Sequence, residues 1–179
     1  MTGREQAPAG GPADRARALG GQLIEIHQWL RAELARIREE IGAYAEGDMP
    51  RSPRMLRAHC TAFCAALTRH HTSEDATAFP ALAAQFPELV PVLDDLRRDH
   101  LLVADILRRL QRLLTTLTAD NVENVRRELD GLTAILESHF QWEERRLVNA
   151  VDALQVPEGG DELFGLPVPT EPTSWERPG

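Results

Sequence analysis

Apolar residues recur at steps of three and four along four segments of the chain, and each of these stripes carries one histidine. The stripe histidines are His27, His70, His100 and His139. Such steps place side chains on one face of an α-helix, and that face is buried in a folded protein. An imidazole is costly to bury unless a partner satisfies its nitrogens. The chain must therefore fold so that four buried histidines each find a partner.

The periodic segments predict an all-α fold of four amphipathic helices. Each helix is about 25–30 residues long and a short connection joins it to the next, which is typical of an up-down-up-down four-helix bundle. The turn at 47–50 ends the first helix, and Ser52 caps the second. Pro80 disturbs the end of the second helix, and Pro87 opens the third. No stretch alternates in polarity as a strand would.

We expect three regions along the 179 residues. Residues 1–13 are rich in Gly, Pro and Ala, which predicts a disordered N-terminus. Residues 14–154 contain the helices and suit one domain with a sizeable core. Residues 155–179 form a Pro-rich C-terminal tail. Its apolar residues are expected to strap it to the bundle: Leu163, Phe164, Leu166 and Trp175.

Composition excludes several classes of protein. A formal net charge of −8 argues against nucleic acid as a partner. No apolar run approaches the roughly 18 residues of a membrane span, and the N-terminus lacks the apolar segment of a secretory signal. Two cysteines without such a signal favour a reducing compartment over a disulfide framework. We expect a cytoplasmic protein that contacts neither membrane nor nucleic acid, as a monomer or a weak homodimer.

The four stripe histidines lie at one height of the predicted bundle. A helix rises about 1.5 Å per residue, so the sequence distance from a turn measures height. His27 lies about 22 residues before the turn near residue 49, and His70 lies about 21 residues after it. His100 lies about 19 residues before the turn near residue 119, and His139 lies about 20 residues after it. We therefore expect the four imidazoles to meet in one layer.

Two glutamates share the histidine faces: Glu74 lies four residues after His70, and Glu143 lies four residues after His139. Residues four apart stack on one side of a helix, so both members of each pair reach the bundle axis. Mixed nitrogen and oxygen ligands suit iron, manganese or zinc, whereas magnesium prefers oxygen alone. A carboxylate can also bridge two metals. The layer thus predicts a two-metal site with open positions for water, oxygen or another small ligand.

With these motifs the chain resembles the hemerythrin-like proteins of the HHE cation-binding family. The residues that carry the resemblance are IEIHQWL around His27, HHTSEDATAFP at 70–80, DHLLVADIL at 99–107 and HFQWEERRL at 139–147. Four such pieces in order on four helices are fairly specific, and they span about residues 14–154. The resemblance implies a non-haem centre with two irons per chain and an oxo or hydroxo bridge. It assigns terminal ligands to His27, His70, His100 and His139, and bridging ligands to Glu74 and Glu143.

The chain departs from the oxygen-carrying hemerythrins at two places. Their second histidine on the third helix is replaced here by Ala104, which cannot bind a metal. His71 is either a substitute ligand, a hydrogen-bond donor behind a ligand, or a residue at the flank of the layer. Their fourth-helix aspartate is replaced by Glu144, which faces about 100° away from Glu143 and so belongs to the surface or to a supporting position. An iron that lacks one ligand would favour reactivity over oxygen storage.

The resemblance leaves two main functions. The first is a di-iron protein that binds oxygen, nitric oxide, peroxide or iron in a sensing, storage or protective role. The alternative is a di-iron oxidase or a catalase-like enzyme that acts on oxygen or peroxide, so enzymatic activity is open. A metal-free helical interaction protein is a third possibility. No substrate-recognition motif points to an organic substrate.

Three further residues precede the layer on the second helix. His59 lies about 16 Å from the layer along the helix and is expected to be a core or tunnel residue. Cys60 and Cys64 are one turn apart, a spacing at which a disulfide requires distortion of a regular helix. We expect buried small side chains there, with a redox or auxiliary metal role as the alternative.

Overall fold

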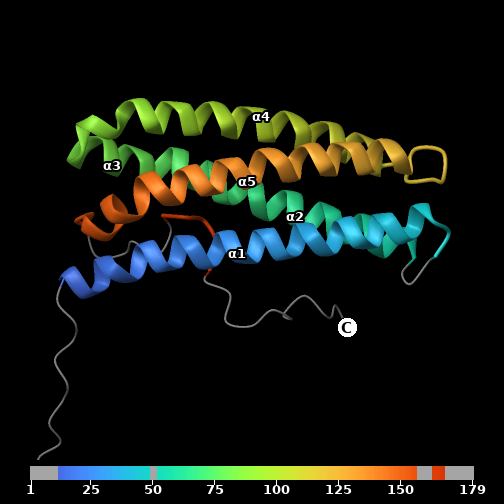
Figure 1. Cartoon of the computed structure of the whole chain (residues 1–179), viewed down its shortest axis with the longest axis horizontal. Helices are drawn as coiled ribbons and strands as arrows, with labels where there is room; N and C mark the ends of the chain where they lie inside the picture. Colours follow the sequence, from blue (N-terminus) through green and yellow to red (C-terminus); the bar gives the residue numbers. More distant parts are fainter. Residues whose placement is uncertain (1–11, 49–51, 157–162, 168–179) are drawn as a thin grey trace, which may run out of the picture.

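Four long helices run side by side and alternate in direction (Figure 1). The computed structural model describes residues 12–48, 52–156 and 163–167. The long helices are α1 (Pro12–Ala45), α2 (Pro53–Ser73), α4 (Val90–Leu114) and α5 (Val122–Ala153). No strand occurs in these three described segments. The prediction of an all-α up-down-up-down bundle is therefore confirmed.

The chain leaves α2 through a helical path instead of a break at Pro80. α2 passes into a π-helical turn, Glu74–Ala78, and then into α3 (Phe79–Gln85) and the 3-10 turn Pro87–Leu89. In the π-helical turn the Phe79 N–H bonds to the Glu74 carbonyl, one residue further back than in an α-helix. Pro80 is tolerated because it lies in the first turn of α3, where its missing N–H needs no partner. Such π-turns often occur at functional sites.

Apolar side chains fill the space between the long helices. α5 contacts both α1 and α4, so it lies at the centre of the packing. Each fully buried Leu or Phe stabilises the fold by roughly 1.5–3 kcal/mol relative to an exposed one. The N-terminus of α2 is capped as predicted, because the Ser52 hydroxyl accepts a hydrogen bond from the Met55 N–H at 3.3 Å. The buried polar side chains in the described core are His27, Glu33, His70, His71, Glu74, His100, His139 and Glu143.

A short piece of the predicted tail, residues 163–167, lies against the bundle. Leu163 and Phe164 are buried in the core, and Leu166 packs on it. The expected strap is thus present at these three residues. Trp175 lies outside the described residues, as do 1–11 and most of the tail, so the predicted disorder there stays a prediction. α1 begins at Pro12, two residues before the expected start, and proline suits the first turn of a helix.

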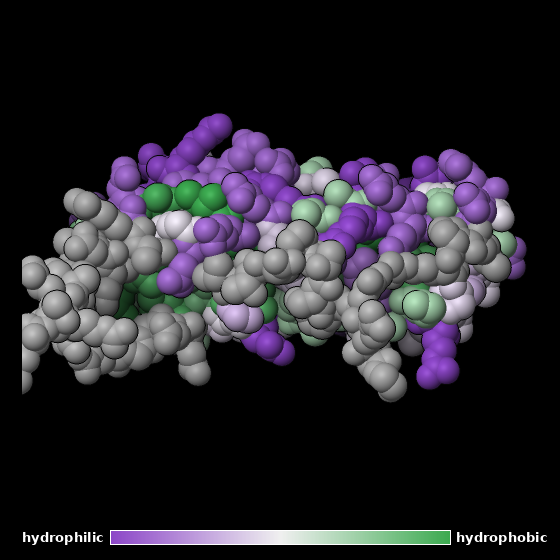
Figure 2. All heavy atoms as spheres, turned by 90° about the horizontal axis from the view of Figure 1, so that it is seen from below, coloured by the Kyte–Doolittle hydropathy of each residue, from purple (hydrophilic) through white to green (hydrophobic). Residues whose placement is uncertain are grey.

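Hydrophilic side chains cover much of the face shown in Figure 2. In the described segments no helix combines the length and the apolar character that crossing a membrane requires.

Candidate metal centre

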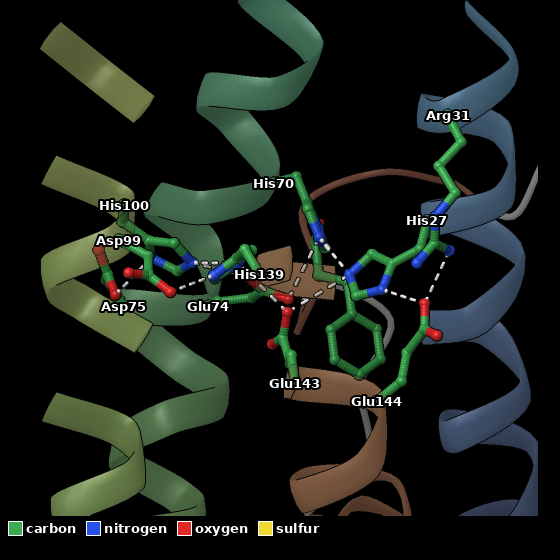
Figure 3. A network of polar contacts seen from close by, with 11 residues as sticks. His27, Arg31, His70, Glu74, Asp75, Asp99, His100, His139, Glu143 and Glu144 are labelled. Carbon is green, nitrogen blue, oxygen red and sulfur yellow. Dashed lines mark hydrogen bonds and ion pairs between the residues drawn. The ribbon is translucent and has the colours of Figure 1, made fainter. Parts of the chain in front are cut away.

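The four stripe histidines meet in one layer of the bundle, one from each long helix (Figure 3). All four side chains are buried, with at most 4% of any residue exposed. His27 Nε2 lies 3.2 Å from His70 Nε2, and His100 Nε2 lies 3.2 Å from His139 Nε2. The layer therefore consists of two imidazole pairs whose Nε2 atoms face inward.

Glu74 and Glu143 lie between the two imidazole pairs, and both are buried. The Glu74 oxygens lie 3.3 Å from His70 Nε2 and 3.5 Å from His100 Nε2. The Glu143 Oε2 atom lies 3.4 Å from His27 Nε2 and 3.5 Å from His139 Nε2. Each carboxylate therefore contacts one imidazole of each pair.

His71 joins the layer beside the second pair. Its ring stacks on the His100 ring with centroids 4.0 Å apart and an interplanar angle of 11°, and its edge meets His139 at 5.1 Å. Its Nε2 atom is buried without a hydrogen-bond partner. The potential ligand atoms form two groups, each within 4.8 Å: His27 with His70 and Glu74, and His71 with His100 and His139.

The Nδ1 atom of each stripe histidine has an acceptor outside the layer. The acceptors are Glu144 for His27 at 2.9 Å, the Phe164 carbonyl for His70 at 2.9 Å, Asp75 for His100 at 3.0 Å and Asp99 for His139 at 3.2 Å. A carbonyl or a carboxylate only accepts, so the proton of a neutral imidazole resides on Nδ1. The Nε2 lone pairs then point into the layer, as metal-binding imidazoles require.

Sequence reasoning missed three of these four acceptors. Asp99 directly precedes His100 in the chain, yet it accepts from His139 on the neighbouring helix. Asp75 directly follows Glu74 and accepts from His100. The fourth, Glu144, has the supporting position expected as one alternative, and its carboxylate also accepts from Arg31 at 2.9 Å.

Four buried polar atoms of the layer lack a hydrogen-bond partner. Both Glu74 oxygens, Glu143 Oε2 and His71 Nε2 have no hydrogen-bond partner. Burial, together with the neighbouring Glu143 carboxylate, holds the pKa of Glu74 well above its usual range. Burial and the surrounding imidazoles hold the pKa values of His70 and His71 well below theirs. Bound cations would satisfy these atoms, and the mixed donor set suits iron, manganese or zinc.

Aromatic rings close the layer on two sides. Phe140 stacks on His27 with centroids 4.0 Å apart, and Phe79 stacks on His100 at 5.5 Å. Both phenylalanines are fully buried. They exclude water from the layer, which strengthens every electrostatic interaction inside it.

His59 belongs to a separate cluster between α1 and α2. Its Nε2 atom lies 2.9 Å from Glu33 and its Nδ1 atom lies 3.1 Å from Glu40. His59 is half-buried, so the expectation of a core residue was wrong: it belongs to a hydrogen-bonded cluster near the surface, together with two glutamates. Burial raises the pKa of both Cys60 and Cys64 to about 12, so these thiols stay protonated and are poor metal ligands. The expectation of buried small side chains is confirmed for the cysteines.

A family model described as hemerythrin HHE cation binding domain matches residues 21–152. The matched range contains all seven side chains of the layer. The comparisons with curated proteins and with solved structures give no match.

Proposed function

Since the chain belongs to the hemerythrin HHE cation-binding family, we propose that it is a non-haem di-iron protein that binds oxygen, nitric oxide or peroxide in a sensing or protective role. One observation carries the proposal. Three carboxylate oxygens and one imidazole nitrogen lie buried without hydrogen-bond partners beside two imidazole pairs. Such a group of atoms is unfavourable without cations and is the expected set of ligands for two of them.

The ligand groups would divide between two iron positions. His27 and His70 would hold one iron, and His71, His100 and His139 would hold the other. Glu74 and Glu143 would be shared, because each carboxylate contacts imidazoles of both groups. When bound, such a pair of irons supplies coordination positions at which a small ligand binds or is reduced.

The protein side chains favour a small ligand at the iron position held by His27 and His70, which is called the first iron position below. The His27–His70 position has two imidazoles against three at the other, which leaves more room there. The seven side chains of the layer are at most 4% exposed, so a large organic substrate does not reach their inward-facing atoms. Phe140 beside His27 keeps the position dry.

Metal counting and spectroscopy on one preparation test the proposal. Protein from iron-supplemented cells is expected to contain two irons per chain and to show a visible band that changes reversibly with oxygen or nitric oxide. Sustained turnover of peroxide would instead favour the catalase-like alternative. Absence of iron under iron-replete conditions would contradict both.

His71→Ala is expected to remove one of the two irons. The change deletes the third imidazole of the His71–His100–His139 group and leaves the His27–His70 group intact. Metal analysis per chain measures the loss, and the circular dichroism of the helices is expected to stay unchanged. His59→Ala is the matched control, because it removes an imidazole outside the layer. If His71→Ala still bound two irons, His71 would not be the ligand that replaces the histidine missing at Ala104.

Iron binding is expected to release a proton from Glu74. Metal needs the ionised carboxylate, whereas the raised pKa keeps the metal-free carboxyl protonated to higher pH than usual. Because one proton must leave Glu74, the affinity of the protein for iron falls by about tenfold for each pH unit below that raised pKa. Titration calorimetry of ferrous iron in buffers of different ionisation enthalpy counts the protons. Glu74→Gln is expected to abolish this proton release, and an unchanged count would show that another group supplies it.

A further inference from the structure

One of the four histidines differs from the others in its acceptor. His27, His100 and His139 donate to carboxylates, whereas His70 donates to the backbone carbonyl of Phe164. This carbonyl comes from a segment 94 residues further along the chain. The segment, residues 163–167, is called the strap below. The Nδ1 partner of His70, which would hold one of the irons together with His27, thus lies in a part of the chain outside the four helices.

The strap has several anchors beside His70. Leu163 and Phe164 are 7% and 4% exposed and pack within the core, so undocking would expose two large apolar side chains. The Thr77 hydroxyl lies 3.2 Å from the Leu163 carbonyl oxygen. The strap therefore contacts the π-helical turn as well as the last turns of α2.

Gly165 lets the strap approach α2 closely enough for the His70 hydrogen bond. Its φ of +67° lies in the left-handed region that favours glycine. A Cβ atom at this position would lie 2.3 Å from Ser73 Oγ and 2.6 Å from the Arg69 carbonyl oxygen. The Arg69 contact is with helix backbone, which cannot move aside without disturbing α2. Any other residue at 165 must therefore lift the strap.

From these contacts we infer that the Phe164 carbonyl, held in place by Gly165, is the positioning group for His70. It keeps the proton on Nδ1 and directs the Nε2 lone pair toward the first iron position. A neutral carbonyl raises the basicity of Nε2 less than a carboxylate would, so His70 would bind a metal more weakly than the other three histidines. The first iron is therefore the one whose retention depends on the strap. This inference rests on the proposed di-iron function.

Gly165→Ala in the full chain tests the inference, with Gly131→Ala as the matched control. An added Cβ at Gly131 meets nothing within 4 Å, so the control changes a glycine without disturbing a contact. In the metal-free protein, ¹⁵N NMR is expected to show the Nδ1–H tautomer of His70 in the wild type and a mixture in Gly165→Ala. In the iron-loaded protein, a ferrous chelator is expected to remove one of the two irons at least about tenfold faster from Gly165→Ala.

Two further variants assign the effect. The His71→Ala background isolates the His27–His70 position, and adding Gly165→Ala there is expected to speed chelator removal of the remaining iron by at least about tenfold. An ester in place of the Phe164–Gly165 peptide bond weakens the carbonyl as an acceptor without adding a Cβ. The ester is expected to speed the loss of the same iron, which keeps the test available if Gly165→Ala folds poorly.

The outcomes separate the inference from the function on which it rests. A wild-type chain without iron would contradict the di-iron function. Two irons in the wild type, with equal loss rates in Gly165→Ala and in the ester, would contradict the role of the strap alone. An unchanged His70 tautomer in both altered chains would do the same.

Discussion

Glu143→Ala is expected to lower the iron content from two per chain to one or none, while the helical content survives. The Glu143 Oε2 atom lies 3.4 Å from His27 Nε2 and 3.5 Å from His139 Nε2, so the change removes an anionic ligand from both iron positions. Only Glu74 would then share charge between the two cations, and a missing metal ligand weakens binding more than any loss behind a ligand does. Metal analysis and circular dichroism on the same preparation measure both quantities.

The neighbouring Glu144→Ala is the matched control. Its carboxylate accepts from His27 Nδ1 and from Arg31, so its loss leaves every inward-facing atom in place. We expect two irons at saturating metal, with affinity weakened by roughly 10–100-fold. If Glu144→Ala emptied the centre and Glu143→Ala did not, the assignment of the fourth-helix carboxylate would be wrong.

Removal of iron is expected to lower the melting temperature by roughly 8–16 °C. A ligand that binds only the folded chain stabilises it by about 4 kcal/mol at a thousandfold excess over Kd. For a domain of this size each kcal/mol corresponds to about 2–4 °C. Without cations, the unpartnered Glu74 and Glu143 oxygens remain buried in the core. Thermal unfolding of iron-loaded and chelator-treated protein measures the difference.

A variant with Glu74→Gln and Glu143→Gln provides the control for this effect. The amides keep the size of the side chains but carry no charge that must be buried. In the metal-free wild type, the raised pKa of Glu74 means that its contribution to stability is present at acid pH and is lost as the pH rises through that pKa. The metal-free double variant is therefore expected to melt above the metal-free wild type at pH 8. If iron raised the melting temperature of the double variant as much as that of the wild type, the stabilising metal would bind elsewhere.

The four long helices could be predicted from sequence patterns within each helix. Apolar residues at steps of three and four predicted the four long helices, and Ser52 marked the start of α2 as expected. The exit from α2 did not follow from the sequence. Pro80 indicated an end, whereas the chain continues helically to Gln85 because a π-helical turn precedes the proline. In that turn the N–H groups bond five residues back instead of four, and no simple sequence pattern predicts this change.

The position of His71 shows where the sequence argument stopped. Adjacency to His70 alone left it as a ligand, a donor behind a ligand or a residue at the flank. Neighbouring residues on a helix point about 100° apart, so His70 and His71 face different partners. Only the packing of α4 against α2 shows that His71 stacks on His100.

By itself the sequence predicted that the four stripe histidines, Glu74 and Glu143 share one layer. Helical rise is fixed at about 1.5 Å per residue, so the distance of each stripe histidine from its turn sets its height in the bundle, whatever the details of helix packing. Only the tertiary structure decided what lies behind these histidines. The partners of the Nδ1 atoms come from other helices and from the strap, as in the Phe164 carbonyl that serves His70. Such contacts depend on how separate elements pack, and no spacing within one element encodes them.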